Sequence, residues 1–205
     1  GMSALFGLAI PLETLALRVA RRGKRSQIGW NGYGSGGLLF ERGAASPIER
    51  VETPTQWRVL LIMPAVLPDR VSGHVEAVRF DALREGNVQV SDVLTELAER
   101  HILPACRSED FDSFAEAVSR FNRESGLLYA GVQGGPYNGR FVSQLIESLQ
   151  RQGAVGLGQS SWGPCVFVFC ENDTTADQVI MSLDRVSLRV MKTQPRNAAR
   201  EWLSG

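Results

Sequence analysis

The sequence contains few residues of the kinds that build metal centres, disulfide frameworks or nucleophilic triads. Its three cysteines, Cys106, Cys165 and Cys170, include no C-x-x-C pair. An odd number without paired spacing argues against a disulfide scaffold or a structural zinc site and is typical of a reducing cytoplasm. The two histidines, His74 and His101, have no ligand-like spacing to cysteine. They therefore do not indicate a zinc site or a Ser-His-Asp triad.

An excess of one charge and a long apolar run are also absent. The 22 Lys and Arg residues balance the 22 Asp and Glu residues. Nothing in this charge balance indicates nucleic acid or an anionic membrane surface as a partner. No apolar run approaches the roughly 20 residues that span a bilayer, and the first residues lack the positive n-region of a signal peptide. We therefore expect a globular cytoplasmic protein that binds neither nucleic acid nor membrane.

Glycine, in contrast, is concentrated in two segments. Ser26–Gly37 has five glycines in twelve residues and follows the cationic run Arg21–Arg25. A glycine-rich connection beside such a run predicts a phosphate environment, although the cations alone are also typical of a solvated helix end. The second segment, Gly156–Pro164, precedes the apolar run Cys165–Cys170. It could present N–H groups and hydroxyls to an anion, or it could be an ordinary tight turn.

The spacing of apolar residues predicts a mixture of helices and strands. We expect helices over 12–20, 90–100, 110–125, 141–152 and 175–183, and strands over 38–41, 57–63, 165–170 and 186–191. Pro104 is expected to interrupt the helical structure that starts near residue 90, and Gly126 to end the helix that starts at residue 110.

The segment 44–56, which contains Pro47 and Pro54, reads as a linker or long turn. We place a domain boundary there, which gives one domain over residues 1–56 and a second over 57–205. Because helices and strands mix along the second domain, with a nearly alternating β-α-β order at its end, the predicted fold class is an α+β sandwich.

Five short segments, taken together and in order, resemble one known family. They are Arg22-Gly-Lys-Arg-Ser-Gln-Ile-Gly29, Gly36-Gly37, Trp57-Arg-Val, Gln133-Gly-Gly135 and Gly-Leu-Gly-Gln-Ser-Ser-Trp-Gly-Pro over Gly156–Pro164. The family is beta-ribofuranosylaminobenzene 5'-phosphate synthase, a branch of the GHMP kinase superfamily, and the resemblance covers its C-terminal two thirds. It implies a partial GHMP-kinase-like N-terminal domain followed by a ferredoxin-like α/β sandwich.

The resemblance also implies an activity. Members of the family join 4-aminobenzoate or 4-hydroxybenzoate to phosphoribosyl pyrophosphate, with release of carbon dioxide and pyrophosphate, in methanopterin biosynthesis. They are expected to need a divalent cation such as Mg²⁺. A phosphorylated small molecule is the implied partner. For Mg²⁺ the sequence offers Glu76, Glu109 and Asp110, each of which also reads as an exposed charge or a helix cap.

The same resemblance suggests which residues bind substrate. We expect Lys24, Arg25 and Ser26 to hold one phosphate group and the N–H groups of 156–161 to hold another. Trp162 either packs against an aromatic ring of the substrate or anchors its loop as part of the core. The full predicted set is Lys24, Arg25, Ser26, Gly29, Gln133, Gly134, Gly156, Gly158, Gln159, Ser160, Ser161 and Trp162.

Two positions depart from the superfamily pattern. Gly29 stands where its small-molecule kinases carry a catalytic Asp, which disfavours a kinase because no carboxylate there could take a proton from the substrate hydroxyl. The segment 7–13, in the place of the principal phosphate loop, has Ala9, Ile10 and Pro11 where glycine and serine are expected. The alternatives to a synthase are therefore an ATP-dependent kinase and a non-catalytic ligand-binding remnant. We also expect a chain truncated relative to the family, whose apolar surface over 5–17 is covered in a homodimer.

Overall fold

The computed structural model describes residues 27–42, 46–66 and 88–201. The chain divides into two compact units, one that runs to Thr53 and takes up the chain again from Pro195, and a second over Pro54–Gln194. The residues from Pro195 onward thus belong to the first unit. No helix among the described residues is long and apolar enough to cross a membrane. The helix expected over 12–20 and the cationic run that follows it lie outside the described residues.

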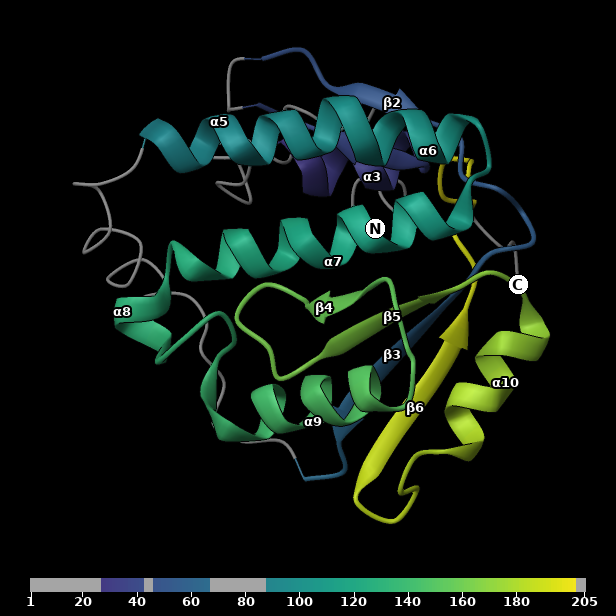
Figure 1. Ribbon diagram of the computed structural model, residues 1–205. Helices are drawn as coiled ribbons and strands as arrows, with labels where there is room; N and C mark the ends of the chain where they lie inside the picture. Colours follow the sequence, from purple (N-terminus) through teal and green to yellow (C-terminus); the bar gives the residue numbers. More distant parts are fainter. Residues whose placement is uncertain (1–26, 43–45, 67–87, 202–205) are drawn as a thin grey trace, which may run out of the picture. The chain divides into compact units, whose positions relative to one another are not determined.

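The second unit is built on a four-stranded antiparallel sheet (Figure 1). Its strands are β3 (Arg58–Pro64), β4 (Leu157–Gln159), β5 (Val166–Cys170) and β6 (Leu188–Thr193). Their order in the sheet is β4-β5-β3-β6. Helices separate β3 from β4 and β5 from β6, so the chain runs β-α-β-β-α-β, which with this strand order is the ferredoxin-like topology. The expected α+β class and ferredoxin-like sandwich are confirmed.

The two faces of this sheet pack against different helices. Val166, Val168 and Cys170 alternate along β5 and are buried in the main core with side chains of α9 (Gly139–Arg151) and α10 (Asp173–Met181). Phe169 points to the opposite face, where its ring lies 5.0 Å from that of Phe114 of α7 (Phe111–Leu127). This alternation is the two-residue period of a strand that is covered on both sides.

The apolar spacing also predicted α9 and α10 to within two residues at each end. In α9 the buried residues stand at i, i+3, i+4 and i+7, as one face of an amphipathic helix requires: Val142, Leu145, Ile146 and Leu149. The helix α10 begins at Asp173 because the Asn172 side chain accepts a hydrogen bond from the Thr175 N–H at 3.0 Å. The last strand starts at Leu188, two residues later than expected, and Val186 is exposed.

Pro104 does not interrupt the helical structure, contrary to expectation. α5 (Val88–Leu97), the π-helical turn η2 (Ala98–Ile102) and α6 (Leu103–Arg107) follow one another without a break (Figure 1). In the π turn the Leu103 N–H donates to Ala98 O. Pro104 then falls in the first turn of α6, directly after the π turn.

Gly126 does not end its helix either. α7 begins after Asp110, whose carboxylate accepts the Ser113 N–H at 3.1 Å, and it continues past Gly126 to Leu127. A Cβ on Gly126 would lie 1.9 Å from the carbonyl oxygen of Pro136. The residue is therefore needed because another segment crosses the helix closely, and not as a stop signal.

The first unit corrects the prediction for the first glycine-rich segment. Residues 28–35 form the helix α3 (Ile28–Ser35) instead of a connection, and only Gly36 and Gly37 after it have positive φ, 63° and 83°. Strands β1 (Leu38–Phe40) and β2 (Glu49–Val51) then pair antiparallel, so the expected linker over 44–56 contains a strand.

The chain after Pro195 is hydrogen-bonded to this hairpin. The Gly37 N–H donates to Arg196 O at 2.7 Å. Asn197 Oδ1 accepts from the N–H and the hydroxyl of Thr53 at 2.8 and 2.9 Å, and its Nδ2 donates to Thr53 O at 2.7 Å. We call residues 195–200 the tail segment. Polar contacts between residues 144 positions apart in sequence thus hold the first unit together.

Candidate functional site

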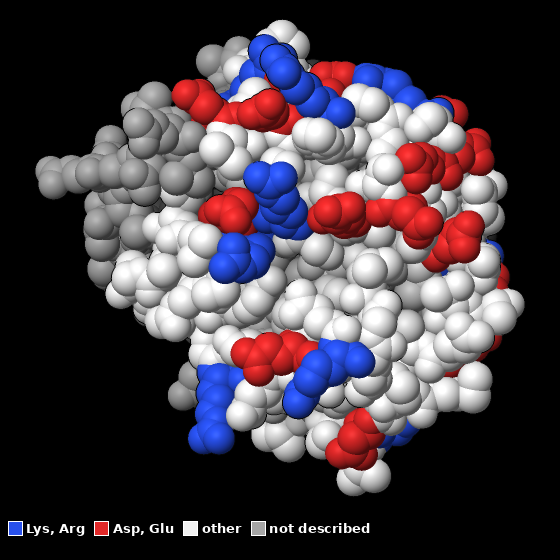
Figure 2. Space-filling model, viewed as in Figure 1, with Lys and Arg blue, Asp and Glu red and all other residues white. Residues whose placement is uncertain are grey.

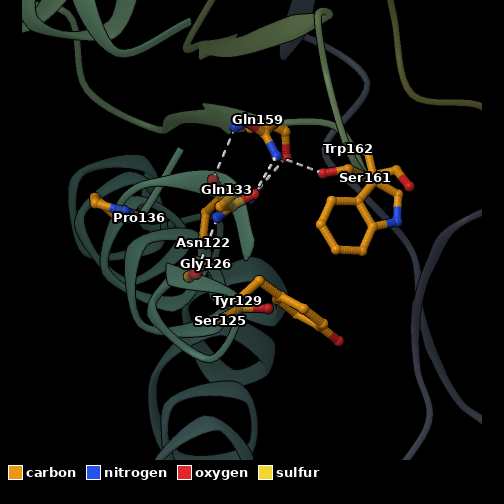
Figure 3. A pocket seen from close by; sticks show the side chains of 9 residues that line it. All are labelled: Asn122, Ser125, Gly126, Tyr129, Gln133, Pro136, Gln159, Ser161 and Trp162. Atoms are coloured by element: carbon orange, nitrogen blue, oxygen red, sulfur yellow. Dashed lines mark hydrogen bonds between the residues drawn. The ribbon is translucent and has the colours of Figure 1, made fainter. Parts of the chain in front are cut away.

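A pocket of about 200 Å³ lies in the second unit, between the C-terminal half of α7, the short helix α8 (Ala130–Gln133) and the turn after β4 (Figure 3). Nine residues line it: Asn122, Ser125, Gly126, Tyr129, Gln133, Pro136, Gln159, Ser161 and Trp162. None of these side chains is ionised at neutral pH, so the pocket presents amides, hydroxyls and aromatic rings rather than charge.

The second glycine-rich segment is only partly a loop, because Leu157–Gln159 form β4 at the edge of the sheet. The Leu157 N–H donates to Ser119 Oγ at 3.0 Å, and the Gln159 N–H donates to Asn122 Oδ1 at 2.8 Å. The Ser160 N–H donates to Cys165 O at 2.9 Å. Three of the N–H groups expected to face an anion therefore have acceptors within the protein, and phosphate binding by this segment stays a prediction.

The side chain of Gln159 is hydrogen-bonded to the turn that follows β4. It is buried, its Nε2 donates to Ser161 O at 2.7 Å, and its Oε1 accepts the Asn138 N–H at 2.6 Å. Asn138 in turn donates through Nδ2 to Trp162 O at 2.7 Å. Buried polar groups are normally hydrogen-bonded, and here the bonds join the turn to the N-terminus of α9.

Gln133 is the second buried glutamine, and its amide has a defined orientation. Its Nε2 donates to the carbonyl oxygens of Gly126 and Gly135 at 2.9 and 3.0 Å. Its Oε1 must therefore point the other way, toward Gln159 Nε2, from which it is separated by 3.5 Å (Figure 3). That distance exceeds the roughly 2.7–3.2 Å of well-formed N–H···O bonds.

The rings of Tyr129 and Trp162 form one wall of the pocket. Their centroids lie 5.2 Å apart at an interplanar angle of 70°, an edge-to-face contact (Figure 3). Trp162 is 7% exposed and therefore packs as part of the interior, but it also lines the pocket, so its contact with an aromatic ring of the substrate stays a prediction. Burial raises the pKa of the Tyr129 phenol, which therefore stays protonated at neutral pH.

The predicted site residues separate into three groups. Gln133, Gln159, Ser161 and Trp162 meet at the pocket, whereas Ser160 is exposed and does not line it. Three predicted glycines are explained by backbone conformation or close packing. Gly134 and Gly156 have positive φ, and a Cβ on Gly158 would lie 2.3 Å from the Asn122 side chain. Gly29 lies in the first turn of α3, in the first unit, and Lys24, Arg25 and Ser26 lie outside the described residues.

Sequence reasoning missed the part of the pocket that α7 contributes. Asn122, Ser125 and Gly126 stand at i, i+3 and i+4 on this helix, and all three line the pocket. Small and polar residues at this spacing share one helix face. They follow directly after the buried apolar residues of the same helix, and this change from apolar to small and polar residues along α7 was the available signal.

The pocket lies within a segment that matches a known family. Residues 102–186 match the family model described as GHMP kinases C terminal. Over this segment the chain is similar to the GHMP kinase superfamily. All nine lining residues of the pocket fall inside the match, and Gly29 falls outside it.

Among curated proteins, the chain is 26% identical over 180 residues to beta-ribofuranosylphenol 5'-phosphate synthase of Methanothermobacter thermautotrophicus. The alignment covers 78% of this chain and 53% of that protein, so the chain spans about half the length of the curated relative it matches. This relative and the family that the sequence motifs resemble are both named as ribofuranosyl 5'-phosphate synthases.

Solved structures of the superfamily share the fold at low sequence identity. Mevalonate pyrophosphate decarboxylase from Streptococcus pyogenes matches with a TM-score of 0.61 at 13% identity, over 97% of this chain and 62% of that one. Homoserine kinase from Cytophaga hutchinsonii matches with a TM-score of 0.59 at 11% identity, also over 97% and 62%. L. major mevalonate kinase, solved in complex with R-mevalonate, matches with 0.58 at 14% identity, over 96% and 63%.

The Mg²⁺ that the resemblance implies would have to bind without a preformed cluster of ligands in the described part of the chain. Among the described residues, no group of three or more His, Cys, Asp or Glu side chains could hold a metal ion. Of the three carboxylates considered, Glu109 accepts a hydrogen bond from Gln56 at 3.1 Å, Asp110 caps α7, and Glu76 lies outside the described residues. On the face shown in Figure 2, basic side chains do not gather into one patch. The requirement for Mg²⁺ stays a prediction.

Proposed function

We propose that this chain takes part in a ribosyl transfer of the beta-ribofuranosylaminobenzene 5'-phosphate synthase type. The donor is phosphoribosyl pyrophosphate and the acceptor is 4-aminobenzoate or 4-hydroxybenzoate, as in methanopterin biosynthesis. The observation that carries the proposal is the 26% identity over 180 residues to the ribofuranosylphenol 5'-phosphate synthase. Gly29 supports it, because the kinases of the superfamily need a carboxylate at that position.

The reaction balances without an added oxidant or base. The bond between ribose C1' and the pyrophosphate oxygen breaks, and its electron pair leaves with pyrophosphate. The ring carbon that carries the carboxylate forms a bond to C1'. The bond between that carbon and the carboxylate then breaks, its electron pair restores the aromatic ring, and carbon dioxide leaves.

This chemistry asks two things of the protein. It must hold highly charged phosphate groups, and it must place an aromatic ring against C1'. For the phosphates we propose Lys24, Arg25 and Ser26, because charge-assisted hydrogen bonds suit phosphate oxygens. Mg²⁺ bound with the substrate would supply shielding of the departing pyrophosphate charge.

An ATP-dependent small-molecule kinase is the second candidate. The fold likeness to homoserine kinase and mevalonate kinase favours it. Against it stands Gly29, where a Cβ would have no heavy atom within 4 Å, so this position offers space but no acid–base group. A chain that binds ligand without turnover, a remnant of such an enzyme, is the third candidate.

Calorimetry with phosphoribosyl pyrophosphate and Mg²⁺, with ATP as the parallel titrant, separates these functions. Binding of the ribosyl donor, followed by release of pyrophosphate and carbon dioxide when 4-aminobenzoate is added, is the expected result. ATP binding with turnover of ATP, and no binding of the donor, would establish the kinase instead. Binding of phosphoribosyl pyrophosphate without turnover would support the third candidate, a remnant that binds ligand but does not catalyse a reaction.

A charge-reversal pair tests the proposed phosphate contact. Arg25→Glu is expected to abolish binding of phosphoribosyl pyrophosphate while the melting temperature stays unchanged. Arg185→Glu, at an exposed residue, is the matched control and should leave binding intact. Unchanged binding in Arg25→Glu would remove this assignment.

Two further features accompany the proposal. We expect the reaction to take place in the cytoplasm, since the three cysteines are free and a reducing compartment keeps them so. We also propose a homodimer that covers the apolar residues over 5–17. Sedimentation at several protein concentrations tests the second point.

A further inference from the structure

We propose that the pocket between α7, α8 and the turn after β4 binds the aromatic acceptor, and that Gln133 Oε1 accepts a hydrogen bond from the ring substituent opposite the carboxylate. This inference rests on the proposed ribosyl transfer for the identity of the ring, and on the pocket alone for the kind of group it takes.

The size and charge of the pocket select among the parts of the two substrates. At about 200 Å³ it is smaller than the roughly 300 Å³ at which ligand pockets for drug-sized molecules begin. Charge-assisted hydrogen bonds from arginine or lysine are the strongest contacts to phosphate oxygens, and no lining residue is basic. Three of the nearby N–H groups, those of Leu157, Gln159 and Ser160, already have acceptors within the protein. The pocket therefore suits the uncharged part of a molecule with a single ring.

Gln133 determines which polar group that ring should carry. Because both Nε2 hydrogens donate to backbone carbonyls, the side chain has no donor left for a ligand. Its Oε1 has two lone pairs, and its one contact among the described residues is the 3.5 Å approach of Gln159 Nε2. This buried amide oxygen can accept a further hydrogen bond through its spare lone pair. An amino or hydroxyl substituent of the ring would donate that hydrogen bond.

The aromatic wall fits the same ligand. Tyr129 and Trp162 meet edge to face, which leaves ring surface of both residues along the pocket. Aromatic rings prefer offset or edge-to-face contact with one another. Ser161 also lines the pocket. Its φ of 52° is a backbone conformation that residues other than glycine rarely adopt.

The two contacts orient the acceptor. With its amino or hydroxyl group on Gln133, the ring presents the opposite carbon, which carries the carboxylate, away from the glutamine. A hydrogen bond accepted from an amino or hydroxyl group strengthens electron donation from that group into the ring. Gln133 thereby favours attack by the carbon that replaces carbon dioxide with ribose.

The first test compares ring ligands that differ only in the donor. 4-Aminobenzoate and 4-hydroxybenzoate are titrated against 4-methylbenzoate, which has nearly the same shape without a donor group. We expect the methyl compound to bind at least tenfold more weakly, because it leaves the buried oxygen with only its 3.5 Å contact to Gln159 Nε2. Equal affinities for the three ligands, or displacement of 4-aminobenzoate by inorganic phosphate, would overturn the proposal.

The second test removes the acceptor from the protein. In Gln133→Met the affinity ratio between 4-aminobenzoate and 4-methylbenzoate should fall to near one. Gln152→Met, at an exposed glutamine just after α9, is the matched control and should keep the wild-type ratio. A Gln133→Met protein that is folded by circular dichroism and keeps the wild-type ratio would overturn the proposal. If this variant does not fold, the ligand comparison on the unaltered chain decides.

The inference and the proposed function fail in different ways. If donor-bearing rings bind selectively but phosphoribosyl pyrophosphate neither binds nor reacts, the pocket assignment stands and the ribosyl transfer falls. If carbon dioxide and pyrophosphate are released while the methyl and amino rings bind equally, the function stands and Gln133 has no part in it.

Discussion

The two compact units of this chain are held together by different forces. In the second unit, two helices and a sheet enclose an apolar core that includes fully buried residues such as Leu60, Ile146 and Val168. In the described part of the first unit, Val51 is the one buried apolar side chain. There the tail segment is tied instead by hydrogen bonds, several of them to Thr53.

Each unit contains one of the two glycine-rich segments, and the comparison shows that glycine content alone does not define a loop. In the first unit most of the segment is helical, and the essential glycine, Gly36, allows the tail segment to pass. In the second unit the segment is half strand, and Gly158 allows Asn122 of α7 to reach the strand. In both cases the glycine is needed where another part of the chain comes too close for a side chain.

If the apolar core stabilises only the second unit, removing a core ring should affect that unit alone. Phe114 is 0% exposed, and its ring lies 4.5 Å from Trp57 and 5.0 Å from Phe169. We expect Phe114→Ala to cost about 3–5 kcal/mol of unfolding free energy. Hydrogen exchange should accelerate in β3 and β5 and stay unchanged in β1 and β2. Equal acceleration in both units would show that they unfold together, and would contradict the view that this core stabilises only the second unit.

Filling the space at Gly158 should have the next largest effect. In Gly158→Ala the new methyl group would occupy the place of Asn122 and break its two hydrogen bonds to the Gln159 backbone, at 2.8 and 2.9 Å. We expect a loss of roughly 2–4 kcal/mol, measured by denaturant unfolding. Gly131→Ala is the control, because a Cβ there has no neighbour within 4 Å. A loss of similar size in the control would contradict the close-approach explanation.

The corresponding change in the first unit is Gly36→Ala. A Cβ would lie 2.3 Å from the Arg196 carbonyl oxygen, at a residue whose φ is already 63°. We expect about 2–3 kcal/mol of destabilisation, seen as faster exchange of the β1 and β2 amides. Gly29→Ala, in the open first turn of α3, should instead stabilise by about 0.5–1 kcal/mol. Replacement of glycine by alanine should thus lower the unfolding free energy at Gly36 and raise it at Gly29. A stabilising effect at both positions would show that the tail segment is not bound beside Gly36 in solution.

The smallest expected effect comes from the tail segment itself. Asn197→Ala removes three hydrogen bonds to Thr53 from a half-buried site. We expect a loss of about 1–2 kcal/mol, confined to the first unit, since each such bond contributes modestly in net terms. Gln194→Ala, at an exposed residue next to the tail segment, should change nothing. Equal exchange rates in the two variants would show that the Asn197 contacts do not stabilise the hairpin.

The elements that the sequence predicted well have a local cause. The strand near 57–63 and the helices near 110–125 and 141–152 are amphipathic or wholly apolar, and their period is visible in any short window. The boundaries that it missed depend on neighbours distant in sequence. Pro104 is accommodated by a π turn, and Gly126 faces Pro136 from inside a helix.

For the candidate site the division is similar. Motif order located Gln133, Gln159, Ser161 and Trp162, and it indicated the superfamily. It did not show that both glutamine side chains are turned inward, that three N–H groups of the second glycine-rich segment are already hydrogen-bonded, or that α7 supplies part of the wall. Hydrogen-bond direction depends on the relative placement of separate segments, which no local pattern contains.

The sequence by itself determined the α+β class, the amphipathic helices, the central strands and the likeness to the GHMP kinase superfamily, because apolar periodicity and motif order are properties of neighbouring residues. Only the tertiary structure decided that a glycine-rich segment becomes a helix, that the chain after Pro195 returns to the first hairpin, and that the buried Gln133 amide donates to two backbone carbonyls. Each of these depends on which groups meet across long stretches of chain, where steric fit and the pairing of buried polar groups outweigh local preference.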